Sequence, residues 1–164
     1  MKLNSFGIIG LIVFATACTS AIPKESLKEV DPEITFQSLI KDPEKYAGKV
    51  ILAGGQIVST TMREGESWVE VLQQPLDGKQ RPQNTDVSYG RFLIRFEGFL
   101  DPEIYAAGRR ITVLAKVAGK KVQILNGMEY TYPALLPRQH YLWKPEAYGG
   151  PSGHFGIGVG GVIR

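Results

Sequence analysis

The sequence of 164 residues contains a single cysteine, Cys18. One cysteine allows no intramolecular disulfide, so the hydrophobic core must hold the fold even in an oxidising compartment. Histidine is nearly as scarce, because His140 and His154 are the only two. Neither has a cysteine or carboxylate neighbour at a spacing typical of metal ligands. We therefore expect no metal site and no cofactor.

Charge of either sign is not concentrated. There are 19 Lys and Arg residues against 16 Asp and Glu residues, a net charge of +3. Proteins that bind nucleic acid usually carry a concentrated basic face, so no nucleic-acid partner is expected. The chain is long enough for one compact domain and no more.

The sequence also lacks a long hydrophobic run. Its longest apolar stretch, within residues 6–14, is interrupted by Gly7 and Gly10 and is shorter than the roughly 20 residues of a membrane-spanning helix. Lys2 precedes this stretch, and the small residues Ala15 and Ala17 follow it. This arrangement predicts a signal peptide over residues 1–17.

Cys18 directly follows Ala-Thr-Ala, which resembles the bacterial lipobox. In that motif the thiol receives a diacylglyceryl group, the chain is cut before the cysteine, and the new amino terminus is acylated. Several acyl chains, at about 0.8 kcal/mol per methylene, make such an anchor effectively permanent. Thr19, where aspartate favours inner-membrane retention, points to the outer membrane as the partner of Cys18. The alternative is an ordinary secretory peptide with an accidental cysteine.

The rest of the chain divides by composition into three parts. Residues 18–30 mix small, polar and charged types and read as a linker after the lipidated cysteine. Residues 31–145 are expected to form the folded domain. Residues 146–164 contain seven glycines, at 149, 150, 153, 156, 158, 160 and 161. So much glycine disfavours a stable isolated element, so we expect this tail to be dispensable for folding.

The first half of the domain is expected to contain one helix and two strands. The helix is expected within 31–40, the strands at 49–60 and 67–73, and a long polar loop at 75–88. Gly54 and Gly55 suit a bulge or the sharp coiling of a small closed barrel. A loop of about fourteen residues is usually functional or mobile.

In the second half, alternation places Phe92, Ile94 and Phe96 on the core face of a strand. A short helix is expected at 101–108, strands at 110–117, 121–125 and 129–136, turns at 119–120 and 126–127, and a further strand at 140–143. Three strands, a helix and two strands is the order of the OB-fold. The fold class is therefore mainly β: a small closed or partly open antiparallel barrel, OB-like, with one or two short helices.

Five side chains are candidates for ligand binding. They are Trp68, Glu70, Tyr89, Arg91 and Arg95. Successive residues of a strand point to opposite sides, so Trp68 and Glu70 share one face while Val69 and Val71 share the other. An exposed Trp68 would offer a stacking platform, but most large aromatic residues are buried and Trp68 is expected in the core. Ion pairing across the barrel is the alternative role for the arginines.

The middle of the chain resembles a known family. The residues that carry the resemblance are Gly54-Gly55-Gln56-Ile57, Glu70-Val71-Leu72, Pro75-Leu76, Arg81-Pro82, Ser88-Tyr89-Gly90-Arg91-Phe92, Gly98-Phe99-Leu100-Asp101-Pro102, Tyr105, Gly108-Arg109, Tyr130, Tyr132-Pro133, His140 and Leu142-Trp143. From about residue 30 to 143 the chain is similar to the starvation-inducible outer membrane lipoprotein family, often called Slp. The resemblance implies a small lipoprotein linked to starvation and envelope stress, without established enzymatic activity.

Two classes of function remain. The first is a non-enzymatic module that binds or braces an envelope protein or glycan, because OB-type barrels bind extended ligands on one sheet face. The second is a hydrolase acting on an envelope polymer. A hydrolase needs a pair of carboxylates or a nucleophile with its base, and neither is evident in the sequence. We expect a binding or scaffolding module without catalytic residues.

Overall fold

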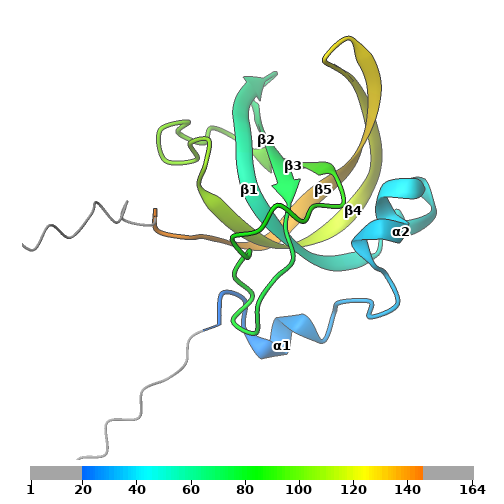
Figure 1. The fold of residues 1–164 in the computed structure, drawn as a ribbon, viewed down its shortest axis with the longest axis vertical. Coiled ribbons are helices and arrows are strands. Elements are labelled where there is room, and N and C mark those ends of the chain that lie inside the picture. The colour runs from blue at the N-terminus through cyan, green and yellow to red at the C-terminus, as the bar shows by residue number, and fades with distance from the viewer. Residues whose placement is uncertain (1–19, 146–164) are drawn as a thin grey trace, which may run out of the picture.

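The computed structural model describes residues 20–145, and these form a closed five-stranded barrel (Figure 1). The elements are α1 (Lys24–Leu27), α2 (Phe36–Lys41), the 3-10 helix η1 (Glu44–Tyr46), β1 (Val50–Arg63), β2 (Glu66–Gln73), β3 (Arg91–Glu97), β4 (Arg110–Leu125) and β5 (Met128–Leu142). The strand order around the barrel is β1-β2-β3-β5-β4. All neighbours are antiparallel except β3 and β5, which run parallel. The expected small, mainly β, OB-like barrel is confirmed.

Strand β1 serves two neighbours in turn. Its first half, Val50 to Gln56, pairs with β4, and its second half, from Gly55 onward, pairs with β2. The strand turns sharply where the two halves meet, so backbones approach closely there. A Cβ atom on Gly55 would lie 1.9 Å from the carbonyl oxygen of Leu72. The two central glycines therefore permit the coiling that closes the barrel.

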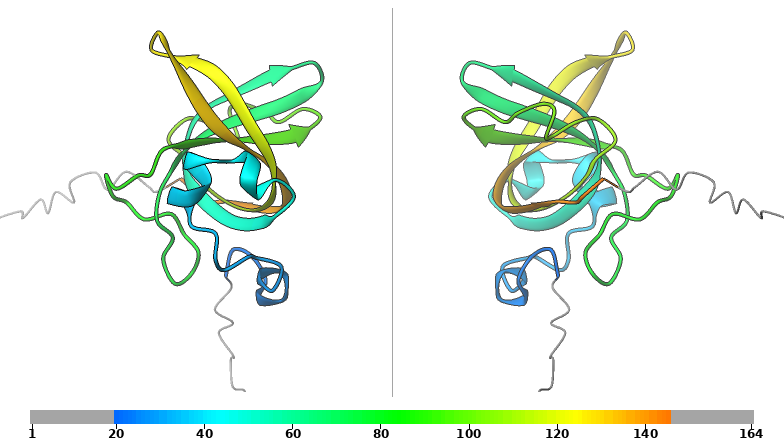
Figure 2. Two further views of the ribbon diagram at one scale, coloured as in Figure 1. Left: turned by 90° about the vertical axis from the view of Figure 1, so that its right-hand side faces the viewer. Right: turned by 90° about the vertical axis from the view of Figure 1, so that its left-hand side faces the viewer.

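The inward-facing residues of all five strands form one core. Its buried members are Leu39, Ile51, Ala53, Ile57, Val69, Val71, Phe92, Ile94, Phe96, Ile111, Val113, Ala115, Val117 and Leu135. Helix α2 covers one end of the barrel (Figure 2), where Leu39 is fully buried and Phe36 meets Phe92 edge-on with ring centroids 5.5 Å apart. The side chain of Thr35 accepts a hydrogen bond from the Ser38 N–H and so begins the helix.

The second half of the chain differs from expectation in two places. Residues 101–108 form turns rather than a helix: the Ile104 and Tyr105 amides both bond to the Asp101 carbonyl, and Gly108 then bonds to Ile57 of β1. Tertiary pairing thus ends the helical turn at once. Strands β4 and β5 also run unbroken through the positions of the expected turn and gap. Gly119, at φ +103°, lies at a bulge in β4, whereas Asn126 and Gly127 form the expected hairpin turn.

A second layer covers the outer face of β1 and β4. The long loop folds onto this face, because Leu76 and Pro82 pair with each other and both lie against Gly54. Residues 20–30, expected to be a linker, also pack here, with Ile22 only 1% exposed. Residues 20–30 therefore lie against the barrel in the described part of the chain. A single large apolar residue such as Ile22 in a polar segment forms no periodic pattern, so the sequence did not predict that this segment packs on the barrel.

Candidate functional site

The outer face of β2 and β3 brings together four of the five predicted site residues. Trp68 and Glu70 come from β2, and Arg91 and Arg95 come from β3. Trp68 lies opposite Arg95 in the register of the two strands. All four point away from the core, because Val69, Val71, Phe92 and Ile94 alternate with them and are fully buried. This surface, defined by Trp68, Glu70, Arg91 and Arg95, is called the β2–β3 face below.

Trp68 is half-buried on the β2–β3 face, so the expectation that it belongs to the core was wrong. The inward positions of β2 are already filled by Val69 and Val71. Two cations lie over the Trp68 ring: Lys121 Nζ is 3.5 Å from the ring centroid and Arg95 Cζ is 6.0 Å from it. Attraction between a cation and an aromatic ring fixes the ring orientation without closing it off from solvent.

The Glu70 carboxylate is the centre of a polar network. Arg91 Nη1 donates to Glu70 Oε1 over 2.7 Å, and the Tyr132 hydroxyl donates to the same oxygen over 3.2 Å. Ser59 Oγ donates to Glu70 Oε2 over 3.3 Å. The hydrogen bond to Glu70 raises the pKa of Arg91, and burial is the main cause of a raised pKa at Tyr132. The Arg91 guanidinium therefore stays charged, and its hydrogen bond to Glu70 holds the two side chains in one geometry.

The long hairpin of β4 and β5 supplies residues that the sequence analysis missed. Lys121 and Tyr132 face each other across this hairpin, and both contact the β2–β3 face, at Trp68 and Glu70 respectively. Tyr130 packs against Tyr132 with ring centroids 4.6 Å apart, and its hydroxyl accepts the Arg91 N–H. The Asn-Gly turn signalled a hairpin, but sequence alone could not show across which strands the hairpin would fold.

Tyr89 stands apart from the other four predicted residues. It lies in the loop before β3, is 43% exposed, and donates its backbone N–H to Gln73 Oε1. The next residue, Gly90, has φ +128° and lies tightly against Tyr130 and Ile40. Tyr89 is thus an exposed aromatic residue in the loop that leads into β3, and its backbone N–H contacts Gln73.

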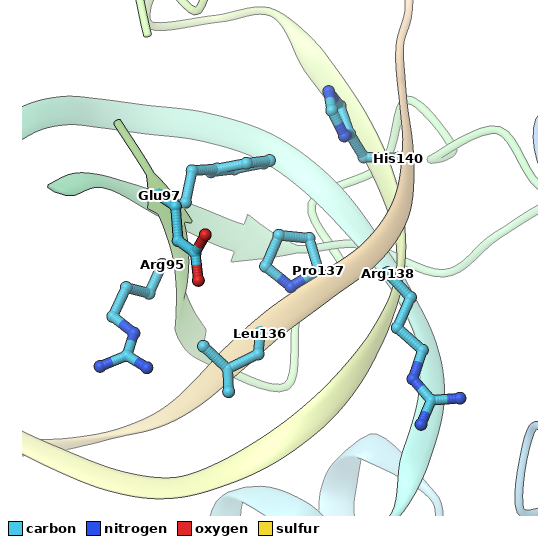
Figure 3. A pocket seen from close by; sticks show the side chains of 7 residues that line it. Arg95, Glu97, Leu136, Pro137, Arg138 and His140 are labelled. Carbon is cyan, nitrogen blue, oxygen red and sulfur yellow. The ribbon is translucent and has the colours of Figure 1, made fainter. Parts of the chain in front are cut away.

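The parallel seam between β3 and β5 is short. Only Leu93 with Ala134 and Ile94 with Leu135 are paired, and beyond them the strands diverge around a cavity of about 380 Å³ (Figure 3). It is lined by Arg95, Phe96, Glu97, Leu136, Pro137, Arg138 and His140. Proline at 137 has no N–H to extend the pairing. Because Arg95 lines this cavity and also lies by Trp68, the cavity adjoins the β2–β3 face.

His140 forms one wall of the seam cavity. Its ring packs edge-on against Phe96 with centroids 5.0 Å apart, and its Nε2 lies 2.9 Å from the Tyr105 hydroxyl. Burial lowers the pKa of His140 below its usual value. Within residues 20–145, no three of His, Cys, Asp and Glu gather in a group that could hold a metal ion. None of the helices in that part of the chain is long and apolar enough to cross a membrane.

A closed five-stranded barrel with an aromatic and charged β2–β3 face places the protein in the class of small OB-like barrels. The chain belongs to the outer membrane lipoprotein Slp family, whose model matches residues 15–154. It is therefore a lipoprotein of the outer membrane. No solved structure matches the chain.

Three relatives illustrate the family. The chain is 26% identical over 134 residues to the outer membrane protein Slp of Escherichia coli, covering 80% of this chain and 71% of that protein. It is 33% identical over 96 residues to an uncharacterised protein of Haemophilus influenzae, covering 58% of this chain and 52% of that protein. It is 25% identical over 112 residues to the E. coli lipoprotein YeaY, covering 68% of this chain and 58% of that protein.

Several sequence predictions fall outside the described residues. The signal peptide at 1–17, the lipidated Cys18 and the glycine-rich tail at 146–164 all lie there. Attachment of lipid at Cys18 therefore stays a prediction for this chain, supported by the lipobox-like Ala-Thr-Ala-Cys sequence.

Proposed function

We propose that this lipoprotein is a non-enzymatic binding module that holds an extended envelope ligand, a glycan or a protein segment, on its β2–β3 face. The observation that carries the proposal is the partly exposed Trp68 ring beside Lys121 and Arg95. Strands 2 and 3 and the flanking hairpins of OB-folds are where such barrels bind extended polymers. The family resemblance extends the proposal to bracing the envelope during starvation or stress.

The chemistry of the face suits a ligand with both a flat apolar side and negative or polar groups. The part of the Trp68 ring that Lys121 and Arg95 leave exposed offers a surface for stacking against a sugar or a side chain. Among the described residues, Lys121 has no carboxylate within ion-pair distance, so its charge is free to meet an anionic group. Arg91 and Glu70 already satisfy each other and serve as a rigid polar edge.

A hydrolase acting on an envelope polymer is the alternative. The best-placed carboxylate on the face is Glu70, and its oxygens already accept hydrogen bonds from three side chains. A general acid or base must exchange protons with substrate, and an oxygen held by an arginine and a tyrosine is poorly suited to that role. This favours binding over turnover.

Capture of envelope material by the immobilised lipoprotein domain tests the proposal. Peptidoglycan sacculi and purified lipopolysaccharide serve as glycan probes, and photo-crosslinking from the β2–β3 face in intact envelopes reports protein ligands. We expect Trp68→Ala and Lys121→Ala to reduce capture at least tenfold. Tyr141→Ala is the matched control, because Tyr141 is a 41% exposed aromatic residue that pairs with Trp143 away from this face.

Two results would contradict the proposal. Capture that is equally strong in Trp68→Ala and Tyr141→Ala would place the ligand elsewhere. Release of soluble fragments from sacculi, abolished by Glu70→Gln in a folded protein, would establish the hydrolase instead.

A further inference from the structure

The side-chain amide of Gln80, in the long loop, forms two hydrogen bonds with the backbone of Ile22. The Ile22 N–H donates to Gln80 Oε1 over 2.6 Å, and Gln80 Nε2 donates to the Ile22 carbonyl over 3.0 Å. Both residues are buried, with Gln80 8% and Ile22 1% exposed. Gln80 adopts φ +65°, a conformation that non-glycine residues rarely hold unless surrounding contacts require it.

Residues of the barrel contact both Gln80 and Ile22. The Thr112 hydroxyl of β4 donates to the Gln80 carbonyl over 2.7 Å and accepts the Trp143 Nε1–H over 3.0 Å. The Ile22 side chain packs against Val50 and Leu114 on the outer face of β1 and β4. We call Gln80, Ile22 and Thr112 the clamp.

Helix α1 and the residues after it add further contacts to the barrel. Arg138 of β5 forms an ion pair with Glu29, and Gln139 Nε2 donates to Ser26 Oγ over 2.9 Å. The segment after the predicted lipid anchor is therefore fastened at several points along its length. A free linker would show none of these contacts.

The clamp leaves very little chain between lipid and barrel. Three residues lie between Cys18 and Ile22, so the four steps from one to the other span about 13 Å at full extension. A free linker over residues 18–30 would span about 40 Å and let the barrel turn in any direction. We infer that the clamp seats the barrel directly on the lipid surface in one orientation, with α1 and the loop at 75–88 against the headgroups. This inference rests on lipid attachment at Cys18 and not on ligand binding.

The orientation turns the β4–β5 hairpin away from the membrane. Helix α1 and the long loop lie together at one end of the molecule, whereas the tip of the β4–β5 hairpin lies at the opposite end (Figures 1 and 2). Lys79 is exposed beside the clamp, and Ile124 near the distal tip is 68% exposed. The acyl chains supply the attachment, so the headgroup-facing surface needs no strong basic patch.

Cysteine scanning of the lipidated protein in vesicles tests this orientation. Cys18 is the only natural cysteine and its thiol is consumed by lipid, so Lys79→Cys and Ile124→Cys each provide one free thiol for a fluorophore. Vesicles contain phospholipids with a nitroxide on the headgroup, which quenches nearby fluorophores. We expect quenching at position 79 to be several-fold stronger than at position 124.

Two changes isolate the clamp. Inserting ten glycine and serine residues between Thr19 and Ser20 leaves the clamp folded but adds slack, and should remove the difference between positions 79 and 124. Gln80→Asn tolerates the same backbone conformation but is too short to reach both Ile22 atoms, and should at least halve the difference. Gln83→Asn is the matched control, because Gln83 contacts Leu76 in the same loop.

Equal quenching at positions 79 and 124 in the otherwise unaltered protein would overturn the inference. Undiminished quenching at position 79 after the ten-residue insertion would do the same, and an unchanged pattern in Gln80→Asn would refute the role of Gln80. If Gln80→Asn loses its folded circular dichroism, the insertion still decides. The readout needs no ligand, so its failure is separable from failure of the β2–β3 face to bind.

Discussion

Lys121 Nζ lies 3.5 Å above the Trp68 ring centroid, which joins the β4–β5 hairpin to the outer face of β2. The two residues are 53 positions apart in the sequence, and neither contributes to the core cluster. Their contact makes the hairpin one wall of the candidate binding face. The ring is thereby oriented while part of it stays exposed.

Replacing Trp68 by alanine should cost about 1 kcal/mol of unfolding free energy, because the ring loses cation–π contacts but leaves no closed cavity. Ile94→Ala, on the opposite side of the same sheet and fully buried, should cost about 2 to 5 kcal/mol. Urea denaturation measures both values. A Trp68→Ala loss as large as that of Ile94→Ala would mean that the ring is a core element.

The Glu70–Arg91 pair should contribute a coupling energy of about 1 kcal/mol. Its side chains are 17% and 30% exposed, so solvent screens the interaction only in part. A double-mutant cycle with Glu70→Ala and Arg91→Ala measures this coupling. The Glu25–Lys28 pair, with side chains 82% and 73% exposed, is the matched control and should give less than about 0.5 kcal/mol. Equal coupling energies for the two pairs would show that partial burial does not strengthen the Glu70–Arg91 interaction.

Stability should fall as the pH drops below about 6.5, the usual pKa of histidine, because of His140. Burial lowers the pKa of His140 in the folded state, so the unfolded chain binds the proton more readily. Acid therefore stabilises the unfolded chain relative to the folded protein and lowers the free energy of unfolding. The titratable and charged groups around the His140 ring are the Tyr105 hydroxyl, which contacts it, and the side chains of Arg95, Glu97 and Arg138, which line the same cavity. Thermal unfolding measured between about pH 5 and pH 8, the interval in which histidine titrates, tests this prediction.

His140→Gln should flatten this part of the pH profile, since glutamine can hydrogen-bond but does not titrate there. His154→Gln is the control and should leave the profile intact. A profile that is unchanged in His140→Gln would assign the pH dependence to other groups.

Gly55→Ala should destabilise the barrel by at least about 3 kcal/mol or prevent folding. The added Cβ would collide with backbone atoms of Leu72, which cannot move without opening the β1–β2 pairing. Gly78→Ala is the matched control, because nothing lies within 4 Å of a Cβ added there. Similar melting temperatures for the two variants would contradict the close approach at Gly55.

Cys18→Ser should block lipid attachment and leave the precursor uncut or released from the outer membrane. The physical reason is that the thiol is the only group in this chain on which the lipobox chemistry can act. Membrane fractionation and mass analysis of the amino-terminal peptide measure the outcome. Finding the unaltered protein free in the periplasm with an unmodified thiol would refute the anchor.

The alternation of apolar residues by itself determined the barrel and its core. Phe92, Ile94 and Phe96 were placed inward by their period of two, and they are buried. Local chemistry also determined the helix after Thr35 and the Asn126-Gly127 turn. These features depend on residues close in sequence, so the pattern carries them.

Contacts between distant residues required the tertiary structure. Whether Trp68 faced the core or the solvent depended on which side of β2 the other strands closed over, a choice that alternation leaves open. Strand β4 continues through Gly119 because Gly119 pairs with Ala134 of β5. The hydrogen bonds between Gln80 and Ile22 likewise join residues that are 58 positions apart. Periodicity records the spacing of neighbours along one strand, and only closure of the barrel decides which residues meet across it.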